Sequence, residues 1–190
     1  KLNGKKVQVF KKIPSYYKSF YESYFHVKNG KYPYLDAKIA VSKDYFTVNR
    51  YSKWITNEYS RSRAHLIRSE YDAILSTSKS INIDNSMLNC RIEGFNNSKP
   101  DLIIIDLNLK IKKNLDIFKK YNKRKIFIVA KPLKNKKINY LKKKGIKFIF
   151  IKSLKTKEDF NNLLKILRKI SYNRILVECG LIFLNQLLKK

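Results

Sequence analysis

The chain has 190 residues, 44% of them hydrophobic and 30% charged, and a formal net charge of +29. This length and hydrophobic share predict one folded domain with a substantial core and exclude a disordered chain. The longest apolar runs, Leu102–Ile105 and Ile126–Ala130, are far shorter than the roughly 20 residues that cross a bilayer, so we expect no membrane span. Cys90 and Cys179 lack the CxxC spacing of a metal site, and they indicate neither a metal nor a disulfide framework but a reducing, cytoplasmic setting.

The amino-terminal part, residues 1–31, is polar and aromatic. We expect a short strand over Val7–Phe10 and a helix from about Ser15 to Val27. We interpret this part as a linker strand and helix that enter a domain formed by residues 32–190. Because the first residue is Lys and not Met, we expect the chain to be a piece of a longer protein.

From residue 34 onward, short apolar segments alternate with amphipathic ones. The apolar segments predict strands over Tyr34–Ser42, Asp72–Ser76, Leu102–Asp106, Ile126–Ala130, Lys147–Ile151 and Ile175–Glu178. The amphipathic segments predict helices over Thr56–Ser69, Lys136–Lys144, Glu158–Ile170 and Gly180–Leu188. Thr56 is the expected cap of the first helix, and a polar loop is expected between residues 76 and 84. This alternation predicts an α/β fold with a mostly parallel central sheet, helices on both faces and right-handed crossovers.

Polar or glycine residues stand where several of the predicted strands end. Open α/β sheets bind ligands at the carboxyl ends of their strands, and this rule selects Ala40–Ser42, Ser76–Ser80, Asp106, Lys131 and Glu178–Gly180. Gly180 opens the last predicted helix, whose first amides favour a phosphate. Glu178 suits a neutral heterocycle or a sugar better, although the segment from Glu178 to Gly180 can equally be an ordinary strand–helix turn.

Arginine is rare in this chain and clustered. Only eight of the 43 basic residues are Arg, and four of them lie between Arg61 and Arg91. Arg holds phosphate or carboxylate through two bonds at once, which Lys cannot do, so the cluster predicts a pocket for an anion unless it arose by chance. His65 shares a helix face with Arg68, and we expect it to be structural because no partner is spaced for a triad. Trp54, at the entrance of this helix, can stack on a cofactor or belong to the core.

The positive charge also permits a second interpretation. A basic chain with a mixed aromatic and charged segment, Ser15–Phe25, has the composition of a module that binds single-stranded nucleic acid. However, Lys, Asn, Ile and Tyr are enriched together, which adenine- and thymine-rich codons explain. The charge is also spread along the chain instead of forming a stripe. Nucleic acid is therefore the weaker alternative.

Several short motifs occur in a fixed order along the chain. They are Lys38-Ile-Ala-Val-Ser42, Ser52-Lys-Trp-Ile-Thr56, the helix through Arg68, Asp72-Ala-Ile-Leu75, Asp84-Asn85 with Leu88 and Arg91, Ile103-Ile-Ile-Asp106 and Val177-Glu-Cys-Gly180. In this order and at nearly these spacings, over about residues 5–190, the chain resembles the reductase domain of the bacterial riboflavin-biosynthesis deaminase–reductase. That family has the dihydrofolate-reductase-like fold.

The resemblance implies a reaction and the residues that serve it. The implied reaction is the reduction of the ribosyl group of 5-amino-6-(5-phosphoribosylamino)uracil to ribityl, with hydride delivered from NADPH to the anomeric carbon of the ring-opened imine. The positions that match the family's substrate contacts are Ser52, Arg68, Leu88, Arg91 and Glu178. The positions that match its NADPH contacts are Ala40, Trp54, Ser80, Asp84, Gly180, Leu181 and Ile182.

The resemblance also implies partners. The family forms homodimers, and its reductase is fused to an upstream zinc deaminase domain. Its sheet continues after the last helix with strands that are absent from residues 1–190. The segment Thr77-Ser78-Lys79-Ser80 stands where the family has Gly-x-Gly-Thr, so a diverged relative that binds a phosphorylated ligand without catalysis is a further alternative.

Overall fold

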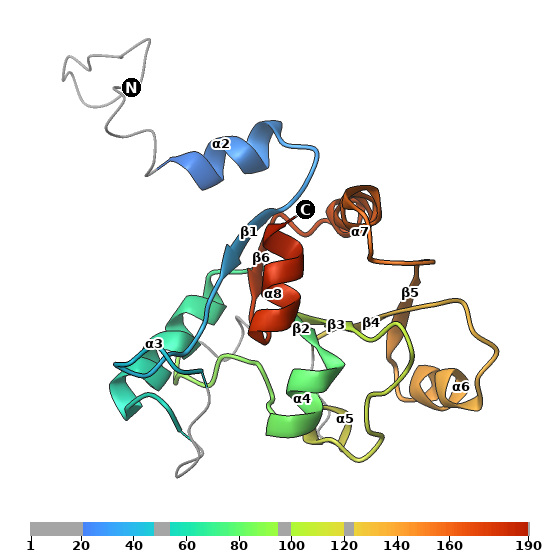
Figure 1. The fold of residues 1–190 in the computed structure, drawn as a ribbon, viewed down its shortest axis with the longest axis horizontal. Coiled ribbons are helices and arrows are strands. Elements are labelled where there is room, and N and C mark those ends of the chain that lie inside the picture. Colours follow the sequence, from blue (N-terminus) through green and yellow to red (C-terminus); the bar gives the residue numbers. More distant parts are fainter. Residues whose placement is uncertain (1–20, 48–53, 95–99, 120–123, 190) are drawn as a thin grey trace.

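The computed structural model describes residues 21–47, 54–94, 100–119 and 124–189, and a parallel β-sheet lies at their centre (Figure 1). The sheet has six strands in the order β1-β6-β2-β3-β4-β5, and every neighbouring pair is parallel. The strands are β1 (Tyr34–Ala37), β2 (Ala73–Thr77), β3 (Asp101–Ile105), β4 (Ile126–Ala130), β5 (Lys147–Phe150) and β6 (Arg174–Val177). The helices of the described ranges are α2 (Glu22–Asn29), α3 (Glu58–Ser69), α4 (Ser78–Asp84), α5 (Asp116–Lys119), α6 (Lys136–Lys143), α7 (Lys157–Lys169) and α8 (Leu181–Leu188).

The central strands are buried on both faces, because successive side chains point to opposite sides and both sides are apolar. On one face Ile74, Leu102 and Ile128 belong to a core that includes residues of α4, α5 and α6, with the partly buried Ile67 of α3 packed against it. On the other face Leu75 belongs to a second core with residues of α7 and α8. The predicted α/β fold, with a parallel sheet between two layers of helices, is thereby confirmed.

The strand order explains why the helices divide in this way. The chain steps from β2 through β5 in one direction across the sheet and then returns to β6, which lies between β1 and β2. Right-handed crossovers place the connecting helices on one face for the outward steps and on the opposite face for the return. The outward helix α4 and the return helix α7 therefore lie on opposite faces, and α8, which follows β6, packs into the same core as α7. Such a switch point leaves a crevice at the strand ends, where α/β proteins bind ligands.

The first strand is shorter than predicted. The sequence predicted a strand over Tyr34–Ser42, but β1 ends at Ala37. Its neighbour β6 ends at Val177, whose carbonyl accepts from the Lys38 amide (3.0 Å), so no strand remains alongside for the following residues to pair with. The other predicted strands agree with the observed ones to within one residue at either end.

The polar loop predicted after β2 is wrong, because this segment forms α4. Thr77 caps the helix, since its Oγ1 accepts from the Ser80 amide at 3.2 Å. Within α4, the side chain of Ile81 is fully buried. Only one large apolar side chain of α4 is buried, so the sequence shows no helical periodicity there. The short helix α5 was not predicted either.

Three predictions concern the chain before α3 ends: the cap of α3, a strand over residues 7–10 and a helix over residues 15–27. The cap predicted at Thr56 is wrong: Asn57 caps α3, and its Oδ1 accepts from the Ser60 amide at 2.9 Å. The strand expected over Val7–Phe10 lies outside the described residues. The helix expected over residues 15–27 lies partly outside them, and its described part coincides with the start of α2.

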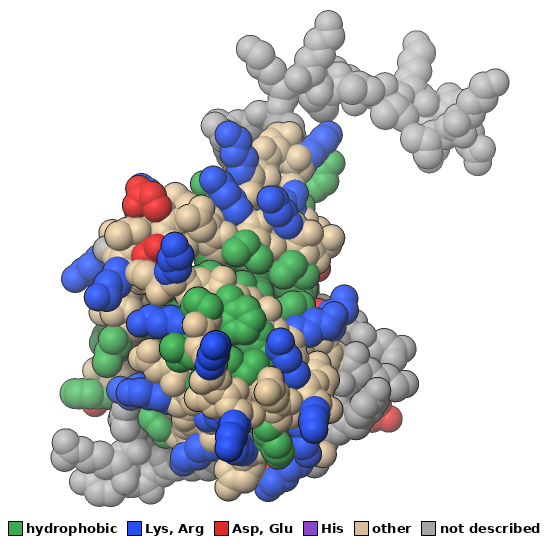
Figure 2. Space-filling view, turned by 90° about the vertical axis from the view of Figure 1, so that its right-hand side faces the viewer, with side chains coloured by type: hydrophobic (Ala, Val, Ile, Leu, Met, Phe, Trp, Pro, Cys, Tyr) green, Lys and Arg blue, Asp and Glu red, His purple; other side chains and the backbone are tan. Residues whose placement is uncertain are grey.

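The surface is strongly basic. In Figure 2, many Lys and Arg side chains surround a patch of hydrophobic side chains near the centre of the visible face, and few acidic side chains are seen. The picture shows no single stripe of positive charge. No helix within the described ranges is long and apolar enough to cross a membrane.

The burial of α7 leads to a stability prediction. Leu163 is 1% exposed on the sheet side of α7, so Leu163→Ala removes packed methyl groups and is expected to lower the free energy of unfolding by about 2–5 kcal/mol. Leu188→Ala is the matched control, because Leu188 is 73% exposed, and its effect should stay within roughly 0.5 kcal/mol. Urea unfolding followed by circular dichroism measures both. Equal losses in the two variants would contradict this placement of α7.

Candidate functional site

The carboxyl ends of β1, β6 and β2 lie side by side at the switch point. The Lys38 amide, just after β1, donates to the Val177 carbonyl at the end of β6 (3.0 Å), and the Glu178 amide donates to the Leu75 carbonyl of β2 (2.9 Å). These backbone bonds hold the residues that leave the three strands at the same edge of the sheet. The side chains of Lys38 and Glu178 therefore start from neighbouring positions.

Arg68 and Glu178 form a two-pronged ion pair between α3 and the end of β6. Arg68 Nε donates to Glu178 Oε1 at 2.6 Å, and Nη2 donates to Oε2 at 2.9 Å. The side chains are 12% and 8% exposed, so both charges are largely removed from water and each depends on the other. Lys38 Nζ lies 3.7 Å from Glu178 Oε2 as a second cation. The structure thus brings two predicted substrate residues into direct contact with each other.

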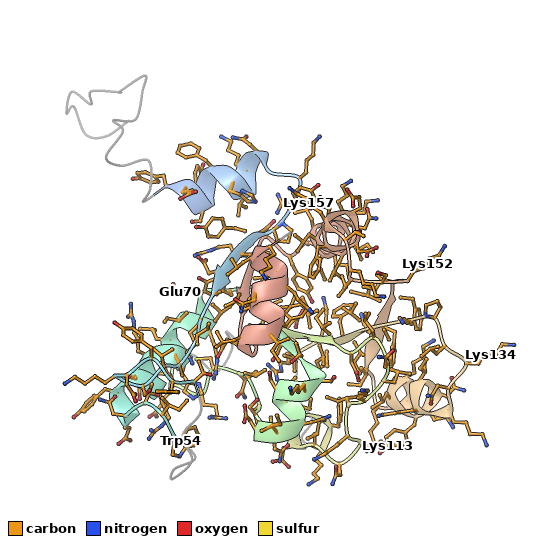
Figure 3. All side chains as sticks on the ribbon, in the orientation of Figure 1. Trp54, Glu70, Lys113, Lys134, Lys152 and Lys157 are labelled. Carbon is orange, nitrogen blue, oxygen red and sulfur yellow. The ribbon has the colours of Figure 1, made fainter. Side chains whose placement is uncertain are left out.

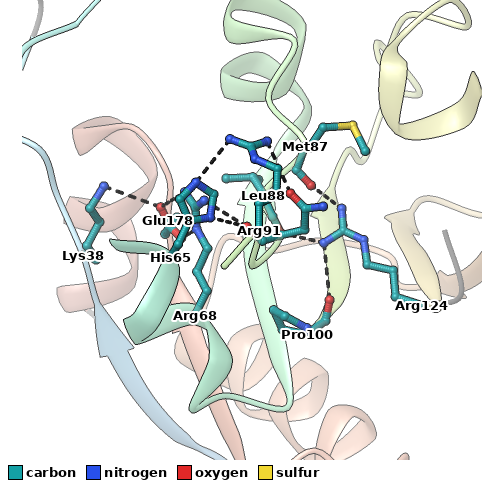
Figure 4. A network of polar contacts seen from close by, with 10 residues as sticks. Lys38, His65, Arg68, Met87, Leu88, Arg91, Pro100, Arg124 and Glu178 are labelled. Atoms are coloured by element: carbon teal, nitrogen blue, oxygen red, sulfur yellow. Dashed lines mark hydrogen bonds and ion pairs between the residues drawn. The ribbon is translucent and has the colours of Figure 1, made fainter. Parts of the chain in front are cut away.

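The segment after α4 carries Arg91 to the same place (Figure 4). Arg91 Nη2 lies 3.2 Å from His65 Nε2, and Arg91 Nη1 donates to Asn89 Oδ1 at 3.4 Å. The Asn89 carbonyl accepts from Arg68 Nη1 at 3.3 Å. Arg68 and Arg91 are therefore linked through one residue and lie on the same side of the sheet edge.

His65 completes the link between the two arginines. Its Nδ1 lies 2.8 Å from the Asn89 carbonyl, which can only accept, so Nδ1 carries the proton and Nε2 offers its lone pair to Arg91. Burial, and next the positive charge of Arg68, lower the pKa of His65. The ring is therefore neutral at neutral pH. The sequence predicted a structural role for His65, and the structure adds a contact with a predicted substrate residue.

Arg124 is an organising residue that the sequence reasoning missed. It is 7% exposed, and its guanidinium donates to the carbonyls of Leu88 (2.5 Å), Pro100 (3.3 Å) and Met87. Burial lowers the pKa of Arg124 to about 10. By holding these carbonyls, Arg124 fixes the segment that leads to Arg91. The one available signal was an Arg in a chain that uses Lys almost everywhere else.

The charges at this edge do not cancel. Lys38, Arg68 and Arg91 bring three positive charges against the single negative charge of Glu178, which leaves a surplus of two. Arg91 is exposed, and a guanidinium carries more N–H donors than its two contacts use. A phosphate monoester carries a charge of about −1.5 to −2 at neutral pH. The arrangement therefore matches the charge of one such group.

The predicted cofactor residues Ser80 and Gly180 meet where α4 and α8 begin. The Gly180 amide donates to Ser80 Oγ at 3.3 Å, and Thr77 Oγ1 lies 3.1 Å from the same hydroxyl. Gly180 caps α8 without a side-chain bond. A Cβ built on it would come within 4 Å of Ser80 Oγ alone among the described atoms, at 3.8 Å. Open backbone amides at a helix start suit a phosphate group, so these residues fit the pyrophosphate of a dinucleotide cofactor.

The other predicted cofactor residues lie at varying distances from this junction. Leu181 and Ile182, in the first turn of α8, are 43% and 68% exposed. Asp84 is exposed one turn after Ser80 and shares its side of α4. Ala40 is partly buried in the segment that follows β1.

Trp54 belongs neither to the core nor to the α4–α8 junction. It is 53% exposed, and the Arg61 guanidinium lies 4.8 Å from the centre of its ring. In Figure 3 it lies near α3, whose first turn carries Arg61, and apart from α4 and α8. Leu88 is 7% exposed with its side chain in the core, has a φ of +45°, and its carbonyl accepts from Arg124. Ser52 lies outside the described residues.

The described residues hold no obvious site for a metal or a thiol nucleophile. Within the described ranges, no group of three or more His, Cys, Asp or Glu side chains could hold a metal ion. Cys90 and Cys179 are free thiols. Burial raises the pKa of Cys179 to about 11, so its reactive thiolate form is scarce at neutral pH.

Fold and side-chain geometry together define an α/β domain with a cluster of cationic side chains around Glu178 at the switch point of a parallel sheet. The chain belongs to the RibD C-terminal domain family, whose model matches residues 33–190. The resemblance seen in the motifs is thereby confirmed.

Individual relatives agree with this assignment. The riboflavin biosynthesis protein RibD of Aquifex aeolicus is 29% identical over 171 residues, which are 89% of this chain and 46% of that protein. RibD of Acinetobacter baumannii superposes with a TM-score of 0.72 at 18% identity, over 90% of this chain and 46% of the other. A deaminase/5-amino-6-(5-phosphoribosylamino)uracil reductase from Thermotoga maritima gives 0.67 at 20% identity, over 86% and 43%. The two structures share the fold, and the chain spans less than half the length of the curated relatives it matches.

The role of Arg124 can be tested by substitution. Arg124→Lys keeps the charge but cannot reach three carbonyls at once, and we expect it to lower the free energy of unfolding by about 1–3 kcal/mol because buried acceptors lose their partners. Amide hydrogen exchange should rise first in residues 87–91. Arg63→Lys on the exposed side of α3 is the matched control. Unchanged exchange in residues 87–91 would show that Arg124 does not hold this segment.

Proposed function

We propose that this chain is a reductase of riboflavin biosynthesis, which uses NADPH to reduce the ribosyl group of 5-amino-6-(5-phosphoribosylamino)uracil to ribityl. Membership of the RibD C-terminal domain family supports the pathway. The relative from Thermotoga maritima bears the name of this reductase, which supports the substrate. The observation that carries the proposal is the surplus of positive charge around Glu178, at the edge where a parallel sheet binds its ligand.

Within this proposal Arg68 has a different role from Arg91 and Lys38. Arg68 donates from Nε and Nη2 to Glu178. Its main proposed role is therefore structural, and it also contributes positive charge to the site. Arg91 and Lys38 are the more exposed cations and are proposed to bind the substrate phosphate. Glu178 keeps accepting capacity on its oxygens and is proposed to orient the sugar or the pyrimidine. Ser52 and the backbone of Leu88 are proposed as further substrate contacts.

The junction of α4 and α8 is the proposed cofactor side. NADPH, when bound, supplies the hydride. The backbone amides of Leu181 and Ile182 at the start of α8 would hold its pyrophosphate, with Gly180 and Ser80 beside them. Asp84, Ala40 and Trp54 complete the proposed contacts. A reaction of this kind needs two reactants held in place more than it needs a strong acid or base, which suits a site without a catalytic dyad.

The setting of the domain is proposed in the same way. The relatives are more than twice as long as the matched region, which supports fusion to another domain. We propose that this is an upstream zinc deaminase domain, joined through residues 1–31 as a linker, in a cytoplasmic protein. We also propose a homodimer, for which sedimentation of the chain as a monomer at micromolar concentration would be contrary evidence.

The phosphate contact can be tested through Arg91. Arg91→Ala should lower kcat/KM for the phosphorylated substrate by roughly tenfold to a hundredfold, since a hydrogen bond to a charged group contributes about 1.5–3 kcal/mol. The dephosphorylated substrate should lose less than about twofold. NADPH absorbance reports turnover, and Arg63→Ala, exposed on α3, is the control.

Two outcomes would count against the reductase. A folded wild-type protein without NADPH oxidation above background would refute the activity. Thermal stabilisation by ribose 5-phosphate but not by NADPH would instead identify a relative that binds a phosphorylated ligand without catalysis.

The cofactor contact can be tested at Gly180. Because Gly180 has a φ of −68° and space for a Cβ, Gly180→Ala should fold with an unchanged melting temperature. Its methyl group would lie where a phosphate approaches the amides, so the Kd for NADPH should rise by about tenfold. Calorimetric titration measures the affinity, with Lys189→Ala at the other end of α8 as the control. An unchanged Kd would remove the start of α8 from the cofactor site.

A further inference from the structure

His65 holds a position that the proposed reaction does not explain by itself. It lies in the middle of α3, is partly buried, and contacts no residue at the start of α4 or α8 in the bonds of its ring. Its two ring nitrogens instead join the Asn89 carbonyl (2.8 Å) to Arg91 Nη2 (3.2 Å). His65 thus connects the backbone of Asn89 with the exposed guanidinium of Arg91.

The Asn89 carbonyl, to which His65 is bonded, belongs to a backbone segment that other residues hold in place. Asn89 is 6% exposed, and its carbonyl also accepts from Arg68 Nη1 (3.3 Å), whose guanidinium is held by Glu178. The neighbouring Leu88 carbonyl is held by the buried Arg124. The imidazole is therefore hydrogen-bonded to a backbone segment that is itself held in place. This bond fixes the position from which His65 Nε2 contacts Arg91.

Arg91 needs such a support. It is exposed, and its side-chain contacts within the described residues are His65 Nε2 and the more distant Asn89 Oδ1 (3.4 Å). An unsupported Arg side chain loses rotamer freedom worth up to about 2 kcal/mol when a ligand fixes it. A neighbour that fixes it beforehand reduces that loss and improves the affinity.

We propose that His65 is a positioning residue for substrate binding, which holds the Arg91 guanidinium in the orientation that receives the substrate phosphate. The inference rests on the proposed function and deepens it. The role requires a side chain that donates to Asn89 and accepts from Arg91 at the same time, and the neutral imidazole does both.

The charges around His65 are consistent with this role. Arg68 faces it from α3, Arg91 from the segment after α4, and Glu178 from the end of β6, with Lys38 beyond Glu178. Partial burial and the two guanidinium groups lower the pKa of His65, and together they outweigh the Asn89 carbonyl and the Glu178 carboxylate, which raise it. An imidazolium would have no lone pair for Arg91.

Substitution separates this role from a structural one. His65→Gln retains a donor for Asn89 and an acceptor for Arg91, so KM for the phosphorylated substrate should stay within about twofold of wild type. His65→Leu removes both groups, and KM should rise by roughly fivefold to tenfold with kcat little changed, because one hydrogen bond to a charged group is weakened. If His65→Leu does not fold, His65→Asn replaces it, since it can donate to Asn89 but is too short to reach Arg91. Ser62→Ala, exposed on α3, is the control.

A double-mutant cycle decides between positioning and packing. If His65 acts through Arg91, His65→Leu should have no further effect in the Arg91→Ala background. An equal effect in both backgrounds, or a His65→Gln enzyme as poor as His65→Leu, would overturn the inference.

Binding of ribose 5-phosphate, measured by calorimetry, keeps the test independent of the reductase activity. If the wild type is inactive, the proposed reaction fails. Weaker binding of ribose 5-phosphate by His65→Leu, but not by His65→Gln, would still support the positioning role. Equal affinity in all three proteins, or no binding by any of them, would refute it.

Discussion

The ion pair between Arg68 and Glu178 is the contact on which the site depends. It joins α3 to the end of β6 across 110 positions of the chain. Both side chains are largely buried, so removing either one would strand a charge, which typically costs about 3–5 kcal/mol. The same carboxylate attracts Lys38, and the same guanidinium reaches the Asn89 carbonyl. One ion pair thus links α3 with the end of β6, and through Lys38 and Asn89 it also contacts the residue after β1 and the segment after α4.

The strand order makes that interaction possible. Because β6 lies between β1 and β2, the last strand of the described chain delivers Glu178 into the centre of a site whose other members come from the first half. Helices α4 and α8, which follow β2 and β6, lie on opposite faces of the sheet. Their starting ends then meet through Ser80 and Gly180. A cluster of cations around Glu178 and a helix start without a side-chain cap therefore lie close together along β6 and α8, which suits the proposed anionic substrate and dinucleotide.

The agreement between predicted and observed elements follows from the strength of local signals. The strand Ile126–Ala130 was predicted to the residue because a continuous apolar run between charged residues has no other stable place than a buried strand. Helix α7 was predicted because its apolar stripe buries Leu163 and Leu167, and its start is fixed by the capping box between Thr156 and Asp159. Helix α4 was missed because its start depends on one cap and its packing on one isoleucine.

For the site, the motifs selected candidate positions but did not predict the side chains that these positions contact. Arg68 was predicted to hold a ligand, and the structure occupies its fork with Glu178. Arg124 attracted attention only as a rare Arg, because nothing near it in sequence predicts that it donates to carbonyls some 24 to 37 positions away. The proton on His65 Nδ1 likewise follows from a carbonyl 24 positions along the chain.

The sequence by itself determined the α/β class, most of the elements and the family, because periodicity, apolar runs and ordered motifs are properties of short segments or of their order along the chain. Only the tertiary structure decided that Arg68 pairs with Glu178 and that His65 contacts Arg91. It also decided that Arg124 holds the segment that leads to Arg91. The physical reason is that each of these contacts depends on which strands become neighbours. That choice is made by the packing of the whole sheet, and no local pattern records it.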